Sequence, residues 1–182
     1  MLSDASGNRV FAVGLLFCAF SLGAYSQNIV INEVMYNPPG GVVEEEYIEL
    51  LNLGPADVNL AEWQITDGVD FRFPPMALGA GEYLVVAANV TSFTAKYPPV
   101  SNVVGNWGGR LSNDGEAIVL RNADNVVVNR VEYSDEGEWA VREEGPLDYG
   151  HRGWTWSDHH DGGGKSLELI RPLMPNEYGQ NW

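Results

Sequence analysis

Cysteine and basic side chains are both scarce in this sequence of 182 residues. Cys18 is the single cysteine, so no disulfide can form within the chain and the fold must be stabilised by its core. Lys and Arg number 10 against 25 Asp and Glu, which gives a net charge of −15. Such a surface repels phosphate backbones, and binding to nucleic acid requires a basic patch, whereas no two Lys or Arg are adjacent here. Nucleic acid is therefore not an expected partner.

Long apolar runs are also rare, and the one that stands out lies near the N-terminus. Val10–Leu22 is an apolar run of the length of a signal-peptide core and is too short to span a bilayer. Small residues at Ala24 and Ser26 suit a signal peptidase, so we expect residues 1–26 to be a signal peptide cleaved before Gln27. An uncleaved anchor is the alternative. Cleavage would leave no membrane span and predicts a secreted or cell-surface protein.

Helical periodicity is missing between residues 29 and 133. Short apolar segments alternate there instead and are separated by Gly, Pro, Asn and Asp. Alternation of this kind is what two packed antiparallel sheets require, because successive side chains of a strand point to opposite faces. It predicts an all-β fold, a β-sandwich formed by residues 27–182 as one domain. The expected strands are Ile29–Tyr36, Tyr47–Asn52, Trp63–Thr66, Phe71–Phe73, Tyr83–Ala88, Ala117–Arg121, Val126–Tyr133 and Ser166–Ile170.

Three segments without a strand pattern are expected to be exposed loops: Pro38–Glu45, Asn89–Gly109 and Asp135–Gly164. The strand Tyr83–Ala88, in contrast, is apolar on both faces. This composition predicts a central strand that is covered on both sides.

Several segments, in this order, resemble the lamin-tail domain. Each one alone is a generic strand or turn, and together they span nearly the whole chain after residue 27, from Ile31 to Ile170. The matching segments are Ile31–Asn37, Glu46–Leu50, Trp63–Asp67, Phe71–Pro74, Tyr83–Asn89, Gly109–Glu116 and Asp161–Ile170, the last of which reads Asp-Gly-Gly-Gly-Lys-Ser-Leu-Glu-Leu-Ile.

The resemblance is closest to the bacterial, exported branch of that family. It implies an immunoglobulin-like β-sandwich and a non-catalytic structural or adhesion module that contacts a protein or an extracellular polysaccharide. The nuclear location and chromatin contacts of animal lamins are not implied, because the predicted signal peptide and the charge of −15 contradict them. The alternative is a carbohydrate- or calcium-dependent binding module, such as an accessory domain of a larger extracellular hydrolase.

Three tryptophans in the last predicted loop are candidate ligand-binding residues. Trp139, Trp154 and Trp156 could stack against sugar rings, as exposed indoles do. Trp154 and Trp156 are two positions apart and share a face if the segment is extended. The alternative is that all three tryptophans cap the core of the sandwich.

Metal-ligand residue types gather in the same loop. Asp158, His159, His160 and Asp161 are weak candidates for a metal site, because no paired spacing such as His-x-x-x-His occurs. A polar surface loop is the alternative.

No cofactor is expected, with calcium as the one alternative. Glu44–Glu46 and Asp135–Glu138 offer the carboxylate oxygens that calcium prefers. Neither segment has the spacing of a known calcium loop.

Catalytic motifs are absent from the sequence. No Gly-x-Ser-x-Gly elbow occurs, and the three histidines lie in one segment without a recognisable triad partner. Gly162–Ser166 is superficially similar to a phosphate-binding loop, but a strand pattern follows it instead of a helix. We interpret these glycines as a tight turn and expect that the protein is not an enzyme.

The predicted cleavage site can be tested directly. When the full chain is produced in an exporting bacterial host, the secreted protein should begin at Gln27, as measured by intact mass and N-terminal sequencing. Ala24→Arg removes a small residue that the peptidase reads and should leave the leader attached. A membrane-bound product that still begins at Met1 would favour the uncleaved anchor.

Overall fold

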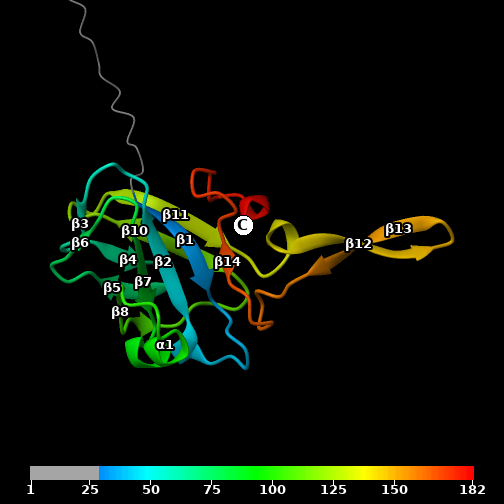
Figure 1. Ribbon diagram of the computed structural model, residues 1–182, viewed down its shortest axis with the longest axis horizontal. Helices are drawn as coiled ribbons and strands as arrows, with labels where there is room; N and C mark the ends of the chain where they lie inside the picture. Colours follow the sequence, from blue (N-terminus) through cyan, green and yellow to red (C-terminus); the bar gives the residue numbers. More distant parts are fainter. Residues whose placement is uncertain (1–28) are drawn as a thin grey trace, which may run out of the picture.

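Two five-stranded sheets form the body of the protein (Figure 1). The computed structural model describes residues 29–182, and the predicted signal peptide, residues 1–26, lies outside them. The first sheet has the order β14 (Leu167–Glu168), β1 (Ile29–Met35), β2 (Tyr47–Asn52), β7 (Tyr83–Ala87) and β8 (Val103–Gly105). The second has the order β11 (Val127–Tyr133), β10 (Glu116–Arg121), β4 (Gln64–Thr66), β5 (Val69–Arg72) and β9 (Gly108–Gly109).

Two smaller strand pairs accompany these sheets. They are β3 (Val58–Asn59) with β6 (Ala77–Leu78), and β12 (Val141–Asp148) with β13 (His151–Ser157). All strand pairs are antiparallel except β7 with β8, which run parallel. The predicted all-β sandwich is confirmed. Among residues 29–182, no helix has the length and apolar character needed to cross a membrane.

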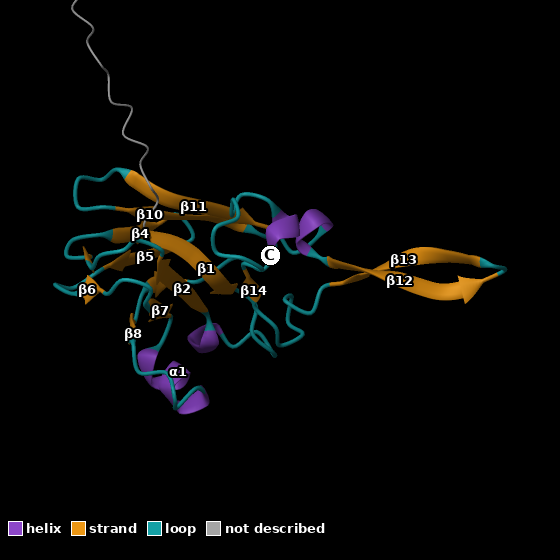
Figure 2. Ribbon diagram, turned by 45° about the horizontal axis from the view of Figure 1, so that its top comes forward, coloured by secondary structure: helices purple, strands orange, loops and turns teal. Residues whose placement is uncertain are grey.

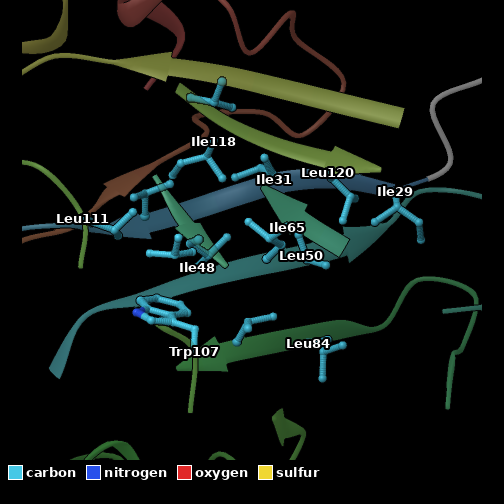
Figure 3. Packing of buried hydrophobic residues seen from close by; sticks show 14 of the residues in the cluster. Ile29, Ile31, Ile48, Leu50, Ile65, Leu84, Trp107, Leu111, Ile118 and Leu120 are labelled. Atoms are coloured by element: carbon cyan, nitrogen blue, oxygen red, sulfur yellow. The ribbon is translucent and has the colours of Figure 1, made fainter. Parts of the chain in front are cut away.

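The core lies between the two large sheets and is built by alternation. In β11, Asn129, Val131 and Tyr133 are buried, while Arg130 and Glu132 between them are exposed. Inward side chains from both sheets meet in one cluster (Figure 3). Burying each large aliphatic side chain contributes roughly 1.5–3 kcal/mol, so this cluster is the main source of stability in a chain without disulfides.

The outer face of β7 is covered by a short helix, α1 (Val90–Lys96). Phe93 of this helix packs with Val85 and Ala87 on that face, and β7 is a central strand covered on both sides, as predicted. The prediction that residues 89–109 form a loop is therefore wrong, since this segment contains α1, β8 and β9. Asn89 caps the helix by accepting a hydrogen bond from the Ser92 N–H at 3.0 Å.

The third predicted loop, Asp135–Gly164, is also corrected by the structure. Residues 141–157 form the hairpin β12–β13, which projects away from the sandwich in both views (Figures 1 and 2). We call this hairpin the arm. Strands of eight and seven residues give the arm a length of about 25 Å at the usual rise per residue.

A buried asparagine joins the two sheets beside a bulge in β1. The pairing of β1 with β2 shifts between Ile31 and Glu33. Asn129 of β11, in the opposite sheet, accepts a hydrogen bond from the Ile31 N–H at 2.9 Å and from Asn176 Nδ2 at 2.7 Å. β1, β11 and the C-terminal segment are thus held at one buried point.

Removing this amide should destabilise the whole sandwich. Asn129→Ala leaves the buried Ile31 N–H without its acceptor and removes the shorter hydrogen bond of Asn176 Nδ2, which should cost about 1–3 kcal/mol of unfolding free energy. The measurement is chemical denaturation followed by tryptophan fluorescence.

The neighbouring residue provides the matched control. Arg130 is exposed and its ion pair is with the exposed Glu132 at 2.6 Å, so Arg130→Ala should change the unfolding free energy by less than about 1 kcal/mol. Equal losses in the two variants would contradict the role assigned to Asn129.

Candidate functional site

The arm pairs only with itself among the described strands, so both of its outer edges are free. Its turn consists of Tyr149 and Gly150, both with positive φ (45° and 84°), as a type I′ hairpin turn requires. Tyr149 is almost fully exposed, at 98 %. Pro146 lies at a shift of register between Glu144 and Leu147, one of the few places where a strand accepts proline.

The register of the arm brings aromatic and charged side chains to one face. Trp156 lies opposite Arg142, and Trp154 lies opposite Glu144. Both indoles are 57 % exposed. The Arg142 guanidinium carbon lies 4.5 Å from the ring centroid of Trp154 and 5.9 Å from that of Trp156. The shared face predicted for the two tryptophans is confirmed, and neither of them caps the core.

Trp139 lies elsewhere. It ends a 3₁₀ turn, Gly137–Trp139, at the base of the arm and is buried in the main core, with 9 % of its surface exposed. Its ring packs against Trp182, with centroids 5.6 Å apart. The structure therefore separates Trp139 from Trp154 and Trp156 and makes it part of the anchor of the arm.

The C-terminal segment completes this anchor. Trp182 Nε1 donates to the Asn176 carbonyl at 3.0 Å, and the Ile170 N–H donates to the Asn181 carbonyl at 2.9 Å. A 3₁₀ turn, Gly179–Asn181, packs directly on the backbone of the turn that contains Trp139. The C-terminus accordingly lies beside the point where the arm leaves the body (Figure 1).

His160, one of the predicted metal ligands, is buried at the return of the chain from the arm. Its Nδ1 lies 2.7 Å from the hydroxyl of Tyr36, whose ring is 4.7 Å from that of Tyr133. Burial lowers the pKa of His160 below its usual value, although Asp161 and Asp158 oppose this effect. The imidazole is therefore neutral at pH 7 and fills a structural position.

The other predicted metal ligands are spread along a tight turn. Asp161 accepts a hydrogen bond from Asn37 Nδ2 at 2.5 Å, and the His159 carbonyl accepts one from the Lys165 N–H at 3.1 Å. The glycines of this segment make the turn into β14, as interpreted from the sequence. Among residues 29–182, no three His, Cys, Asp or Glu side chains gather in a way that could hold a metal ion.

The first acidic segment proposed for calcium has structural partners. Glu45 forms an ion pair with Lys96, and Glu46 is buried and accepts a hydrogen bond from the Leu111 N–H at 2.8 Å. Burial raises the pKa of Glu46 to about 7, against the lowering effect of that hydrogen bond and of Arg110. Calcium binding at this segment or at Asp135–Glu138 stays a prediction.

An open hollow extends from the tryptophan-bearing face into the body. Arg142 and Trp156 line it from the arm, and Ile170 and Trp182 line it from the C-terminal segment. Ile170 is 64 % exposed. Arg142, Ile170 and Trp182 carry no local sequence signal, because only the register of the arm and the packing of the C-terminal segment bring them together.

The surface that results is an aromatic strip with one cation held over it. Indole faces and a guanidinium can stack, form hydrogen bonds and attract negative charge, and they provide no nucleophile or general base. The arrangement is suited to binding.

The part of the chain that matches a known protein family includes most of the sandwich and ends before the arm. The sequence profile of the family described as Lamin Tail Domain matches residues 23–135. No curated protein matches the chain. The matched range contains all of both large sheets except β14, and the arm begins after it.

The anchor of the arm can be tested with two glycine substitutions. A Cβ on Gly179 would lie 2.6 Å from the Glu138 carbonyl carbon and 2.7 Å from the Trp139 nitrogen. Gly179→Ala must therefore push two turns apart and should lower the unfolding free energy by about 1–3 kcal/mol, measured by thermal denaturation.

Gly153, within β13, is the control because a Cβ there would meet nothing within 4 Å. Gly153→Ala should leave the unfolding free energy within about 0.5 kcal/mol of the unchanged protein. Identical behaviour of the two variants would show that the contact between the turns does not hold the arm.

Proposed function

The chain belongs to the lamin-tail domain family, and from this membership we propose that it is a non-catalytic interaction module of an exported protein. The family is one of immunoglobulin-like structural and interaction modules. In the proposal, the sandwich is a rigid support and the arm is the element that contacts the partner.

The observation that carries the proposal is the exposure of aromatic side chains on the arm. Trp154, Trp156 and Tyr149 are each more than half exposed, together with Leu147 at 65 %. An isolated two-stranded hairpin is at best marginally stable in water, and exposed apolar patches mark sites of interaction. A surface of this kind, on a hairpin that extends about 25 Å from the body, is best explained by a partner that covers it.

Export is the second part of the proposal. It is supported by the sequence of residues 1–26, which reads as a cleaved signal peptide. The partner would then be a protein or a polysaccharide at the cell surface or in the extracellular space. The acidic surface keeps such a protein soluble and disfavours nucleic acid.

Shortening the arm tests its role. Glu143 and Thr155 face each other in the register and can be joined by Asn-Gly, which forms a two-residue hairpin turn. The unchanged protein should sediment with cell-envelope material of the producing organism, and the shortened variant should stay in the supernatant.

Thermal denaturation controls for folding, because the core and the anchor of the arm are unchanged in the shortened variant. Equal sedimentation of the two proteins, or no sedimentation of either, would overturn the assignment of the arm as the binding element.

A further inference from the structure

The two faces of the arm carry opposite charge. The register places Arg142, Glu144 and Arg152 on the face of Trp154 and Trp156. We call this the tryptophan face. The opposite face carries Glu143 and Asp148 and has no Lys or Arg. The tryptophan face is thus the less acidic one in a protein with a net charge of −15.

Arg142 is the cation of this face that is available to a ligand. Arg152 already lies 3.8 Å from the Glu144 carboxylate, whereas Arg142 forms no ion pair among the described residues. Its guanidinium is held over both indoles by cation–π contacts. A stacked guanidinium keeps its in-plane N–H groups free, and these form a fork that matches a carboxylate.

The surroundings of Arg142 suit a ligand that is long rather than compact. Trp154 and Trp156 follow one another along β13, and the hollow continues the strip past Trp156 to Ile170 and Trp182. The part of each indole that Arg142 does not cover is a flat apolar surface on which a ring can stack. A polymer whose units carry an apolar ring face would make contacts along the whole strip.

We infer that the tryptophan face binds an acidic polysaccharide, a chain of sugar rings that bear carboxylates. The sugar rings stack on Trp154 and Trp156, and one carboxylate accepts the paired N–H groups of Arg142. This inference rests on the proposed function, because it names the ligand of the arm.

The acidic body does not prevent this contact. Arg142 and Trp156 lie at the base of the arm, but fixed charges are screened over about 8 Å at physiological ionic strength, so only the nearest acidic side chains of the body act on a carboxylate bound there. Glu138 lines the hollow near the body and repels a second carboxylate at that end. The site therefore holds one carboxylate, at Arg142, beside the stacked sugar rings.

The test uses two matched ligand controls with the unmodified protein. Polygalacturonate is the probe, its fully methyl-esterified form keeps the rings without the charge, and polyglutamate keeps the carboxylates without the rings. Titration is followed by calorimetry and by tryptophan fluorescence. Polygalacturonate should bind about tenfold more tightly than either control, because the methyl ester loses the charge-assisted contact with Arg142 and polyglutamate loses the stacking on the indoles, and each loss has about that effect.

Variants locate the site on the protein. Arg142→Gln and Trp154→Ala should each weaken polygalacturonate binding about tenfold or more, and Arg142→Lys should restore only part of the loss because lysine lacks the fork. Arg72→Gln is the control. Arg72 is also exposed and pairs with Glu62 at 2.6 Å, but it lies in β5 of the body. Its substitution should leave the affinity unchanged.

Each other outcome overturns the inference in a recognisable way. Equal binding of the methyl ester would mean stacking without recognition of charge, and equal binding of polyglutamate would mean attraction of any polyanion. If no polysaccharide binds while sedimentation with envelope material still depends on the arm, the inference fails and the proposed function stands. If neither binding nor arm-dependent sedimentation occurs, both fail.

Discussion

The hydrogen bond between the Ile31 N–H and Asn129 holds the protein together at the point where its parts meet. β1 is bulged there, and β14 pairs only with Glu33 and Val34, so Ile31 has no partner strand on that side. Asn129 supplies the missing acceptor from the opposite sheet and binds Asn176 at the same time. A buried N–H without an acceptor lowers the free energy of unfolding. The two sheets and the C-terminal segment must therefore meet in the one arrangement that pairs this N–H with Asn129.

The anchor of the arm is built outward from that joint. The Asn176 carbonyl accepts a hydrogen bond from Trp182, and Trp182 packs on Trp139, which begins the approach to β12. A continuous series of contacts therefore leads from the bulge in β1 to the base of the arm. Residues 176–182 attach the base of the arm to the body. The arm itself is a two-stranded antiparallel sheet that pairs with no other described strand.

Sequence patterns predict the strands that supply most of the core. Val126–Tyr133 is predicted with a difference of one residue because its burial has a period of two, and Tyr47–Asn52 is predicted with the bounds that the structure has, although nearly all of it is buried. The helix α1 was missed because it has seven residues and depends on packing of Phe93 and on the cap at Asn89. The arm was missed for local reasons as well. Pro146 interrupts the strand, and Tyr149-Gly150 replaces the Asn-Gly that usually marks such a turn.

The sequence also predicts only part of the candidate site. Spacing alone placed Trp154 and Trp156 on one face, but it could not place Arg142 above them, because cross-strand neighbours depend on register. Nor could spacing separate Trp139, which packs in the core, from two tryptophans that do not. The consequence is a division between two regions. Side chains on the tryptophan face contribute little to the core, so substitutions there should leave the sandwich folded, whereas Trp139, Trp182 and Asn129 pack or form hydrogen bonds within the body and affect its stability.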